Sequence, residues 1–177
     1  MRPEEEEAGR LLQKHGVGVM PVPVEDIARL EGAQIARHRF EGNESGFILR
    51  DGRQTIIGVN TLTSRRRQRF TIAHEVGHLL LHEGRPLIVD HSVRVNLRDE
   101  VSAMASDVEE IQANAFAAAL LMPREFLLER LGLYVTKVQN SAKSLSREDL
   151  IGQLGREFDV SAEAMGYRLI NLGVLAT

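Results

Sequence analysis

Apolar residues recur along the chain with two different spacings, which separate predicted helices from a predicted β region. Residues 24–30 carry apolar positions at helical spacing, and Glu31-Gly32 ends that pattern. Residues 34–40, 47–50 and 55–59 alternate in part between apolar and polar positions, which favours short strands. Asp51-Gly52, between the last two, is a strong signal for a tight hairpin. The pattern therefore predicts a short helix followed by a small antiparallel sheet.

Longer helical patterns occupy the middle of the chain. From residue 64 to about residue 82, apolar positions repeat on one helical face, while four arginines crowd the first turns. Residues 90–99 are typical of a loop or an edge strand, because apolar and polar residues alternate there. A second long helix is predicted from about 105 to 122, and its alanines allow another helix to approach closely. Pro123 ends this helix and opens a third.

The C-terminal part has a pattern of its own. Residues 136–146 are polar and weakly patterned, which indicates a linker. Ser146 to Asp149 is a helix-start signal, and Asp159 to Ser161 favours a turn into a last helix. This arrangement has a helix-turn-helix shape. We therefore predict two parts, residues 1–135 and a small helical segment of residues 136–177 packed on them.

Composition and charge narrow the possible functions. The 177 residues are 43% hydrophobic and include no cysteine, so a metal ion would have to be held by His, Asp or Glu. A net charge of -3 gives no global reason to bind nucleic acid or an anionic membrane. The N-terminus is acidic where a secretion signal would be basic and then apolar. The longest apolar run, residues 116–122, is far shorter than the roughly 20 residues of a bilayer span. We expect a soluble cytoplasmic protein without a membrane segment, and its oligomeric state stays open.

One motif carries chemistry: His74-Glu75-Val76-Gly77-His78, inside the predicted helix that starts near residue 64. Residues four apart lie on one helical face about one turn apart, so both imidazoles can reach a single zinc ion. Glu75 lies beside them and can act on a water at the metal without being a ligand. The alternative is that these are two surface histidines on a helix. The charged residues before the motif and the apolar stretch after it disfavour that alternative. The motif therefore predicts a zinc site with two histidine ligands and a catalytic glutamate.

A catalytic zinc site needs a third protein ligand and one open position. His82 cannot join the other two, because it lies roughly 12 Å from His74 along a helix axis. The second long helix offers two candidates, Glu109 and Glu110. Glu110 lies on the same helical face as Asn114, whose side-chain amide can orient a ligating imidazole by a hydrogen bond. Acidic residues near a helix start also suit the helix dipole. Spacing alone therefore leaves the third ligand open.

Two segments together resemble the ImmA/IrrE family of zinc metallopeptidases: RFTIAHEVGHLLLH at 69–82 and EIQANAFAAALLMP at 110–123. The resemblance extends to GFILRDGRQTIIGVN and to FDVSAEAMGYRLINLGVL, so it covers most of the chain from about Val24. It implies an α+β, zincin-like fold in which a small antiparallel sheet packs on helices that include the HEVGH helix. It also implies one Zn²⁺ per chain, held by His74, His78 and Glu110, with Glu75 as the catalytic acid/base.

The resemblance implies a function as well. Family members typically cut or inactivate a helix-turn-helix repressor and so release genes of a mobile element or a stress response. We therefore expect a zinc endopeptidase that acts on an Xre-like helix-turn-helix repressor. As a hypothesis, an edge of the hairpin at 47–59 aligns an extended substrate by strand addition. Longer members carry a sensor domain after the helical part, and none is expected in a chain that stops at Thr177.

Two alternatives from other functional classes stay open. The first is a DNA-binding regulator with a mainly structural zinc, supported by the C-terminal helix pair and the basic run at 65–69. Residues 146–172, however, hold three arginines and five acids, a net charge of -2, so direct nucleic-acid binding is not expected. The second is a non-hydrolytic regulator, such as a toxin-antitoxin component, that binds a repressor without cutting it. Nothing in the residues separates holding from cutting.

Overall fold

The computed structural model describes residues 2–41, 44–82, 87–91, 105–139 and 146–176. Within these ranges none of the helices is long and apolar enough to span a bilayer. In chain order the elements are α1 (Pro3–Lys14), α2 (Val24–Leu30), β1 (Ala33–His38), β2 (Glu44–Arg50), β3 (Thr55–Asn60), α3 (Arg65–Leu81), β4 (Leu87–His91), α4 (Ala105–Leu121), α5 (Arg124–Gln139), α6 (Arg147–Glu157) and α7 (Ala162–Asn171).

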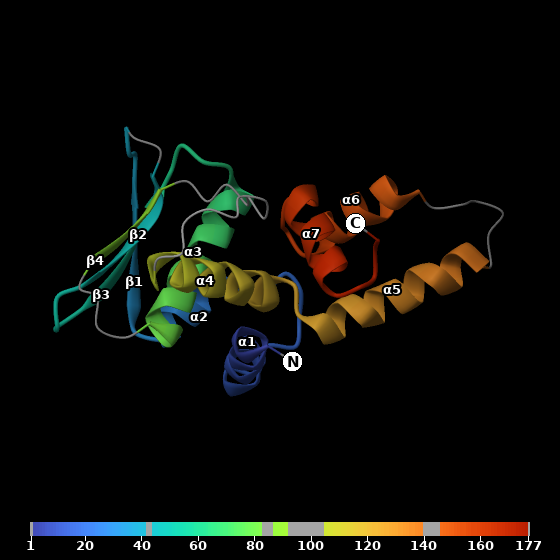
Figure 1. Ribbon diagram of the computed structural model, residues 1–177, viewed down its shortest axis with the longest axis horizontal. Helices are drawn as coiled ribbons and strands as arrows, with labels where there is room; N and C mark the ends of the chain where they lie inside the picture. Colours follow the sequence, from blue (N-terminus) through green and yellow to red (C-terminus); the bar gives the residue numbers. More distant parts are fainter. Residues whose placement is uncertain (1, 42–43, 83–86, 92–104, 140–145, 177) are drawn as a thin grey trace.

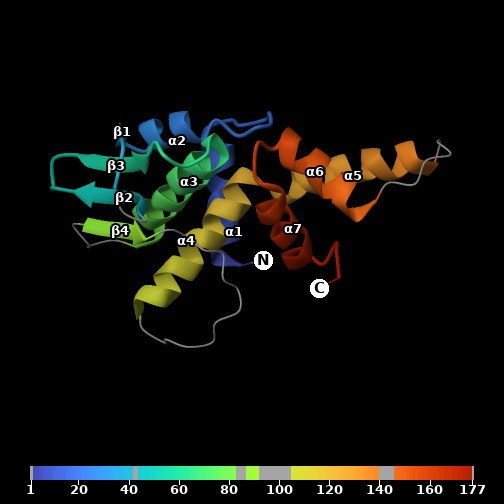
Figure 2. The same ribbon diagram turned by 90° about the horizontal axis from the view of Figure 1, so that it is seen from above.

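The sheet lies at one end of the molecule and α5, α6 and α7 at the other, with α3 and α4 between them (Figures 1 and 2). Helix α3 packs against β2 and β3 on one side and against α4 on the other, and α1 covers α4. The side chains that fill the space between these layers are fully buried, among them Ile48, Ile57, Ile72 and Phe116. The predicted α+β architecture, a small sheet packed on helices that include the HEVGH helix, is confirmed.

The strand order is β1-β3-β2-β4, and one pairing differs from the prediction. Strands β2 and β3 form the predicted antiparallel hairpin, and β4 pairs antiparallel with β2. Strand β1, however, runs parallel to β3, so the expectation of a purely antiparallel sheet is wrong. The chain reverses from β1 into β2 and leaves the space of one strand, which β3 then fills. Alternation of apolar residues marks a strand but carries no information about its partner or direction.

This order also rules out an edge at the hairpin. Both β2 and β3 are paired on both sides, so the hypothesis that residues 47–59 present an edge to a substrate is wrong. Among the described strands, β1 and β4 are the outer ones. Strand β4 overlaps the start of the loop or edge strand predicted at 90–99, and residues 92–99 lie outside the described part of the chain.

The predicted helix starts agree with the structure, whereas the predicted linker starts too early. The hydroxyls of Ser64, Ser146 and Ser161 cap α3, α6 and α7 by accepting a backbone N–H of the first turn. Helix α5 continues to Gln139, so the linker predicted from residue 136 begins inside a helix. Residues 136–139 of this polar stretch belong to a helix, because polarity marks exposure as well as loops, and residues 140–145 lie outside the described part of the chain. The division at residues 135 and 136 therefore falls within α5 and stays a prediction.

A cluster of charges ties the turn between α6 and α7 to the start of α3. The Asp159 carboxylate lies 2.9 Å from Arg65 Nη2, 3.5 Å from Arg66 Nε and 3.3 Å from Arg69 Nε. Arg69 is buried and also donates from Nη2 to the carbonyl of Val22, at 2.9 Å. These three arginines of the basic run at 65–69 thus make contacts within the protein. This observation argues against the DNA-binding alternative.

Replacing Asp159 with Asn is expected to lower the free energy of unfolding by about 2 kcal/mol, because Arg69 keeps its buried charge and loses its partner. Asn suits this position, since the residue has a left-handed φ of 52° that Asn also adopts readily. Chemical denaturation measures the loss. Arg65→Gln is the matched control, because that side chain is 79% exposed, and it is expected to cost less than about 1 kcal/mol. Equal losses in the two variants would contradict this account.

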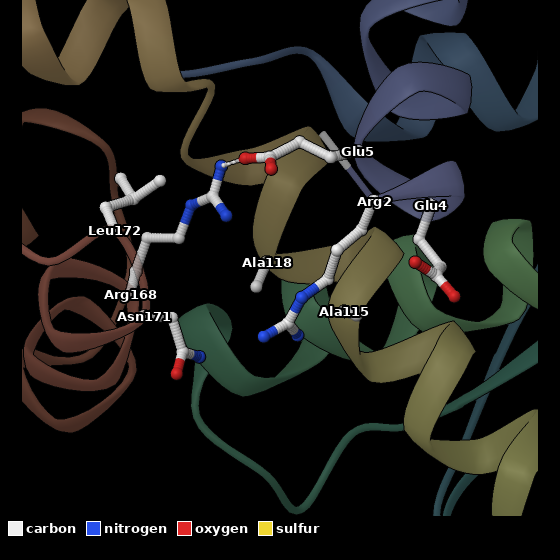
Figure 3. Close-up of a pocket in the computed structure, with 8 residues that line it drawn as sticks. All are labelled: Arg2, Glu4, Glu5, Ala115, Ala118, Arg168, Asn171 and Leu172. Carbon is white, nitrogen blue, oxygen red and sulfur yellow. Dashed lines mark hydrogen bonds and ion pairs between the residues drawn. The ribbon is translucent and has the colours of Figure 1, made fainter.

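A second buried arginine joins the two ends of the chain. Arg168 of α7 donates from Nε to the carbonyl of Met122, at 3.0 Å, and from Nη2 to Glu5 Oε1 of α1, at 2.5 Å. The pair lies beside a cavity of about 50 Å³ between α1, α4 and α7 (Figure 3). Arg168 is one of the three arginines counted in the C-terminal segment. Its guanidinium is buried against protein acceptors, so it is not placed to neutralise phosphates.

Candidate metal centre

The candidate site forms where α3 and α4 cross at very short range. A Cβ atom added to Gly77 would lie 3.1 Å from Phe116 Cδ1 and 3.2 Å from Ala113 Cα. Gly77 on α3 therefore faces Ala113 on α4, and the two helix backbones pack in close contact there. This confirms the close approach that the alanines predict. Because Glu110 and Asn114 flank Ala113 on α4, the crossing brings both of them against α3.

Substituting Gly77 by Ala is expected to destabilise the fold by about 1–3 kcal/mol, since a methyl group would force the helices apart. Gly132→Ala is the matched control, because it also lies within a helix but no atom beyond its own stretch of helix lies within 4 Å of the added Cβ. The control is expected to gain about 0.5–1 kcal/mol from the lower backbone entropy of alanine. Thermal unfolding of both variants separates the two effects. A gain in both would mean that the helix crossing has room for the methyl group.

Three side chains converge at this crossing: His74, His78 and Glu110. The two Nε2 atoms lie 3.0 Å apart. Glu110 Oε2 lies 3.2 Å from His74 Nε2, and Glu110 Oε1 lies 3.2 Å from His78 Nε2. Ligands about 2.0–2.1 Å from a tetrahedral zinc ion are separated by about 3.3 Å, so the two imidazole nitrogens and the Glu110 carboxylate fit an ion of that size. Both imidazoles are completely buried, and the Glu110 side chain is 37% exposed at the rim.

The environment favours the protonation states that a metal ligand needs. Burial lowers the pKa of His78, and this effect outweighs the nearby Glu110 carboxylate, so the ring is neutral at neutral pH. Burial by itself would raise the pKa of Glu110, but the hydrogen bonds and charges of His74 and His78 outweigh it and lower that pKa well below its ordinary value. The group therefore offers neutral imidazole and ionised carboxylate, which are the forms that bind metals.

Asn114 lies where the sequence pattern placed it, against the first histidine. Its Oδ1 atom is 3.1 Å from His74 Nδ1. In the arrangement that leaves the Nε2 lone pair facing Glu110, His74 Nδ1–H donates to this amide oxygen. Such a bond fixes both the tautomer and the orientation of the ring. The second long helix thus contributes a candidate ligand and the group that orients another.

Glu75 is completely buried on α3, next to the converging ligands, and strand β2 lies over it. A Cβ on Gly46 of β2 would lie 2.4 Å from Thr71 Cγ2, 2.5 Å from the Gly58 carbonyl and 3.6 Å from Glu75 Oε1. Only glycine lets the strand pass this close to the helix. The sequence pattern placed Gly46 in the hairpin without a role, because nothing local shows which helix lies beneath a strand.

Sequence reasoning also missed Arg50. This strand residue donates from Nη1 to the carbonyl of His82, at 2.9 Å, and from Nη2 to the carbonyl of His78, at 2.5 Å. A cation at the last carbonyls of a helix interacts favourably with the negative end of the helix dipole. Arg50 therefore holds the last turn of α3, which carries His78, against the sheet. The contact joins residues 28 and 32 positions apart, so no local signal announces it.

Comparison with known proteins gives related sequences. Residues 13–170 match a peptidase family described as the IrrE N-terminal-like domain. The radiation response metalloprotease IrrE of Deinococcus deserti is 33% identical over 120 residues, which are 67% of this chain and 37% of that protein. IrrE of Deinococcus radiodurans is 37% identical over 82 residues, 46% of this chain and 23% of that protein. The matched part of the chain thus spans 37% and 23% of the lengths of these two relatives.

A solved structure shares the fold. It is titled Mycobacterium tuberculosis transcriptional regulator and aligns with a TM-score of 0.60 over 96% of this chain and 46% of that chain. The two sequences are 19% identical, so the likeness concerns the fold alone.

Proposed function

Because the chain belongs to the metallopeptidase family of the IrrE N-terminal-like domain, with its zincin-like α+β fold, we propose that it is a zinc-dependent endopeptidase that cleaves a helix-turn-helix repressor. One observation carries the proposal. Three side chains able to bind a metal, His74, His78 and Glu110, converge with nitrogen and carboxylate oxygen atoms 3.0–3.2 Å apart, and Glu75 is buried beside them.

The side chains divide the chemistry among them. A zinc ion bound here supplies a Lewis acid and lowers the pKa of a water molecule toward about 7. His74, His78 and Glu110 would hold it, and Asn114 would keep the ring of His74 in its ligating orientation. Glu75 accepts the proton of the attacking water and then donates it to the amine that leaves the scissile peptide bond. Three protein ligands leave a fourth position for water and substrate, which a purely structural zinc site would fill with protein.

The substrate class rests on the family and not on a contact in the structure. We propose an Xre-like repressor, whose cleavage would release mobile-element or stress-response genes in the cytoplasm. Binding without hydrolysis is one alternative, and it does not explain why a glutamate is buried beside three candidate ligands. Direct DNA binding has less support, since Arg65, Arg66 and Arg69 are engaged by Asp159.

The proposal is tested by incubating the zinc-loaded protein with the helix-turn-helix repressor encoded nearest to its gene and recording intact masses. We expect two fragments whose masses add up to the repressor plus one water molecule, and no fragments after the metal is removed with a chelator. A repressor that stays uncut but co-purifies with the protein would favour the binding alternative. A repressor that is neither cut nor bound would exclude this partner. Zinc content, measured on the same sample, tests the metal site separately.

A further inference from the structure

Behind the second histidine, on the side away from Glu110, two more side chains continue a row of contacts. His78 Nδ1 lies 3.1 Å from His82 Nδ1, and His82 Nε2 lies 3.0 Å from Gln112 Oε1. His82 follows the last turn of α3 and is buried, with 8% of its surface exposed, whereas Gln112 belongs to α4. The row therefore runs from a candidate ligand, through the histidine just after the same helix, to an amide on the crossing helix.

Only one arrangement of protons in this row leaves His78 able to bind a metal. A ligating Nε2 carries a lone pair, so the ring proton of neutral His78 must be on Nδ1, which then donates. Its partner, His82 Nδ1, must accept and therefore carries no proton. The proton of neutral His82 is then on Nε2, where it donates to Gln112 Oε1. Every bond in the row has one donor and one acceptor in this arrangement.

The opposite arrangement does not leave His78 able to bind a metal. It would place the proton of His78 on Nε2, facing His74 and Glu110, and would leave no lone pair for a metal. It would also require the Gln112 amide to turn and present its NH2 group to His82 in place of the carbonyl oxygen. We infer that His82 and Gln112 are positioning residues, which hold His78 in the tautomer and orientation that bind zinc. This inference rests on the proposed metal site.

The surrounding contacts keep the row in place. Arg50 binds the carbonyls of both His78 and His82, so the backbone that carries the two rings is fixed against β2. On α4, Asn114 orients His74 directly and Gln112 orients His78 through His82. Alternate residues 110, 112 and 114 of one helix thus supply a ligand and the orienting groups of both other ligands.

A role as an additional zinc ligand does not fit His82. Its Nδ1 faces the Nδ1 of His78, which is the opposite side of that ring from the converging Nε2 atoms. His82 also lies outside the group of donor atoms formed by His74, His78 and Glu110. It therefore acts through His78.

The test compares zinc affinity, measured by competition with a chromophoric chelator, in the wild type, His82→Leu and His82→Asn. Loss of such an outer partner typically weakens metal binding 10–100-fold, so we expect a loss of about that size in His82→Leu. His82→Asn should recover most of it, because the amide Oδ1 can accept from His78 Nδ1 as the histidine does. Gln112→Leu removes the outer acceptor from a partly exposed position and should weaken zinc binding less, in the same direction.

Two further readouts separate positioning from general stability. The unfolding midpoint of each metal-free variant shows whether the fold is intact. Cobalt(II) bound at saturation reports ligand geometry through its absorption, which we expect to change in His82→Leu and to return toward the wild type in His82→Asn. Wild-type affinity in a folded His82→Leu, or equal losses in the Leu and Asn variants, would overturn the inference.

The design also separates failure of the inference from failure of the proposed site. Zinc binding that is lost in Glu110→Gln but unchanged in His82→Leu would overturn the positioning role alone. A wild-type protein that binds no zinc would overturn the proposed site and the positioning role together.

Discussion

Glu75→Gln is expected to lower the rate of repressor cleavage by about 100-fold or more while zinc stays bound, because the variant loses the group that moves the proton. Gln has nearly the same shape as Glu, so the side chain still fits beneath Gly46 and beside Thr71. The charge and the basic oxygen disappear, whereas the three ligands stay in place. The expected result is thus a folded, metal-loaded protein that binds its substrate and does not cut it.

Intact mass spectrometry of the repressor over time measures this rate, and metal analysis of the same preparation shows whether zinc is retained. Co-purification with the uncut repressor serves as the control for substrate binding. Cleavage at the wild-type rate would remove Glu75 from the mechanism. Loss of zinc together with activity would show that the residue supports the metal, and the proton-transfer role would then lack support.

Glu110→Gln is expected to weaken zinc binding by more than about 100-fold, beyond the usual effect of losing an outer partner of a ligand. The carboxylate is the anionic member of the set, and both imidazoles contact it at 3.2 Å. An amide oxygen in its place is a neutral and weaker ligand. The same two contacts keep the pKa of Glu110 low, so the ligand is charged throughout the neutral range.

Glu109→Gln is the matched control, since it removes the same charge from the neighbouring position of the same helix. Its zinc affinity should stay close to that of the wild type. Chelator competition at neutral pH measures both variants. Equal losses would mean that the charge of α4 attracts the metal without a specific ligand, and a loss confined to Glu109→Gln would reassign the third position.

The parts of the site that lie along one helix could be predicted from the sequence, because helical geometry relates residues four positions apart. His74 and His78 share a face of α3 for this reason, as do Glu110 and Asn114 on α4. The choice of Glu110 over Glu109 needed the resemblance to a family, and in the structure the Glu110 carboxylate contacts both histidines.

Contacts between distant segments could not be predicted in this way. Asp159 lies 93 positions from Arg66, and β1 pairs with β3 past the intervening β2. Arg50 likewise reaches the end of α3 from a strand, and the charge of an arginine gives no hint of its acceptor. Local periodicity records which face of an element is buried. It does not record what covers that face. For this reason the predicted direction of β1 is wrong, and the ion pairs around Asp159 could not be predicted.

The helix crossing at Gly77 also bears on how a metal would act on the chain as a whole. Two of the candidate ligands lie on α3 and one on α4, so an ion held by all three would be a crosslink between segments separated by roughly 30 residues. Such a crosslink closes a loop that is open in the unfolded chain. An ion that binds only the folded chain would add its binding free energy to the free energy of folding. The ion would hold together the two helices whose contact creates its own site, so its removal would loosen the scaffold as well as end the chemistry.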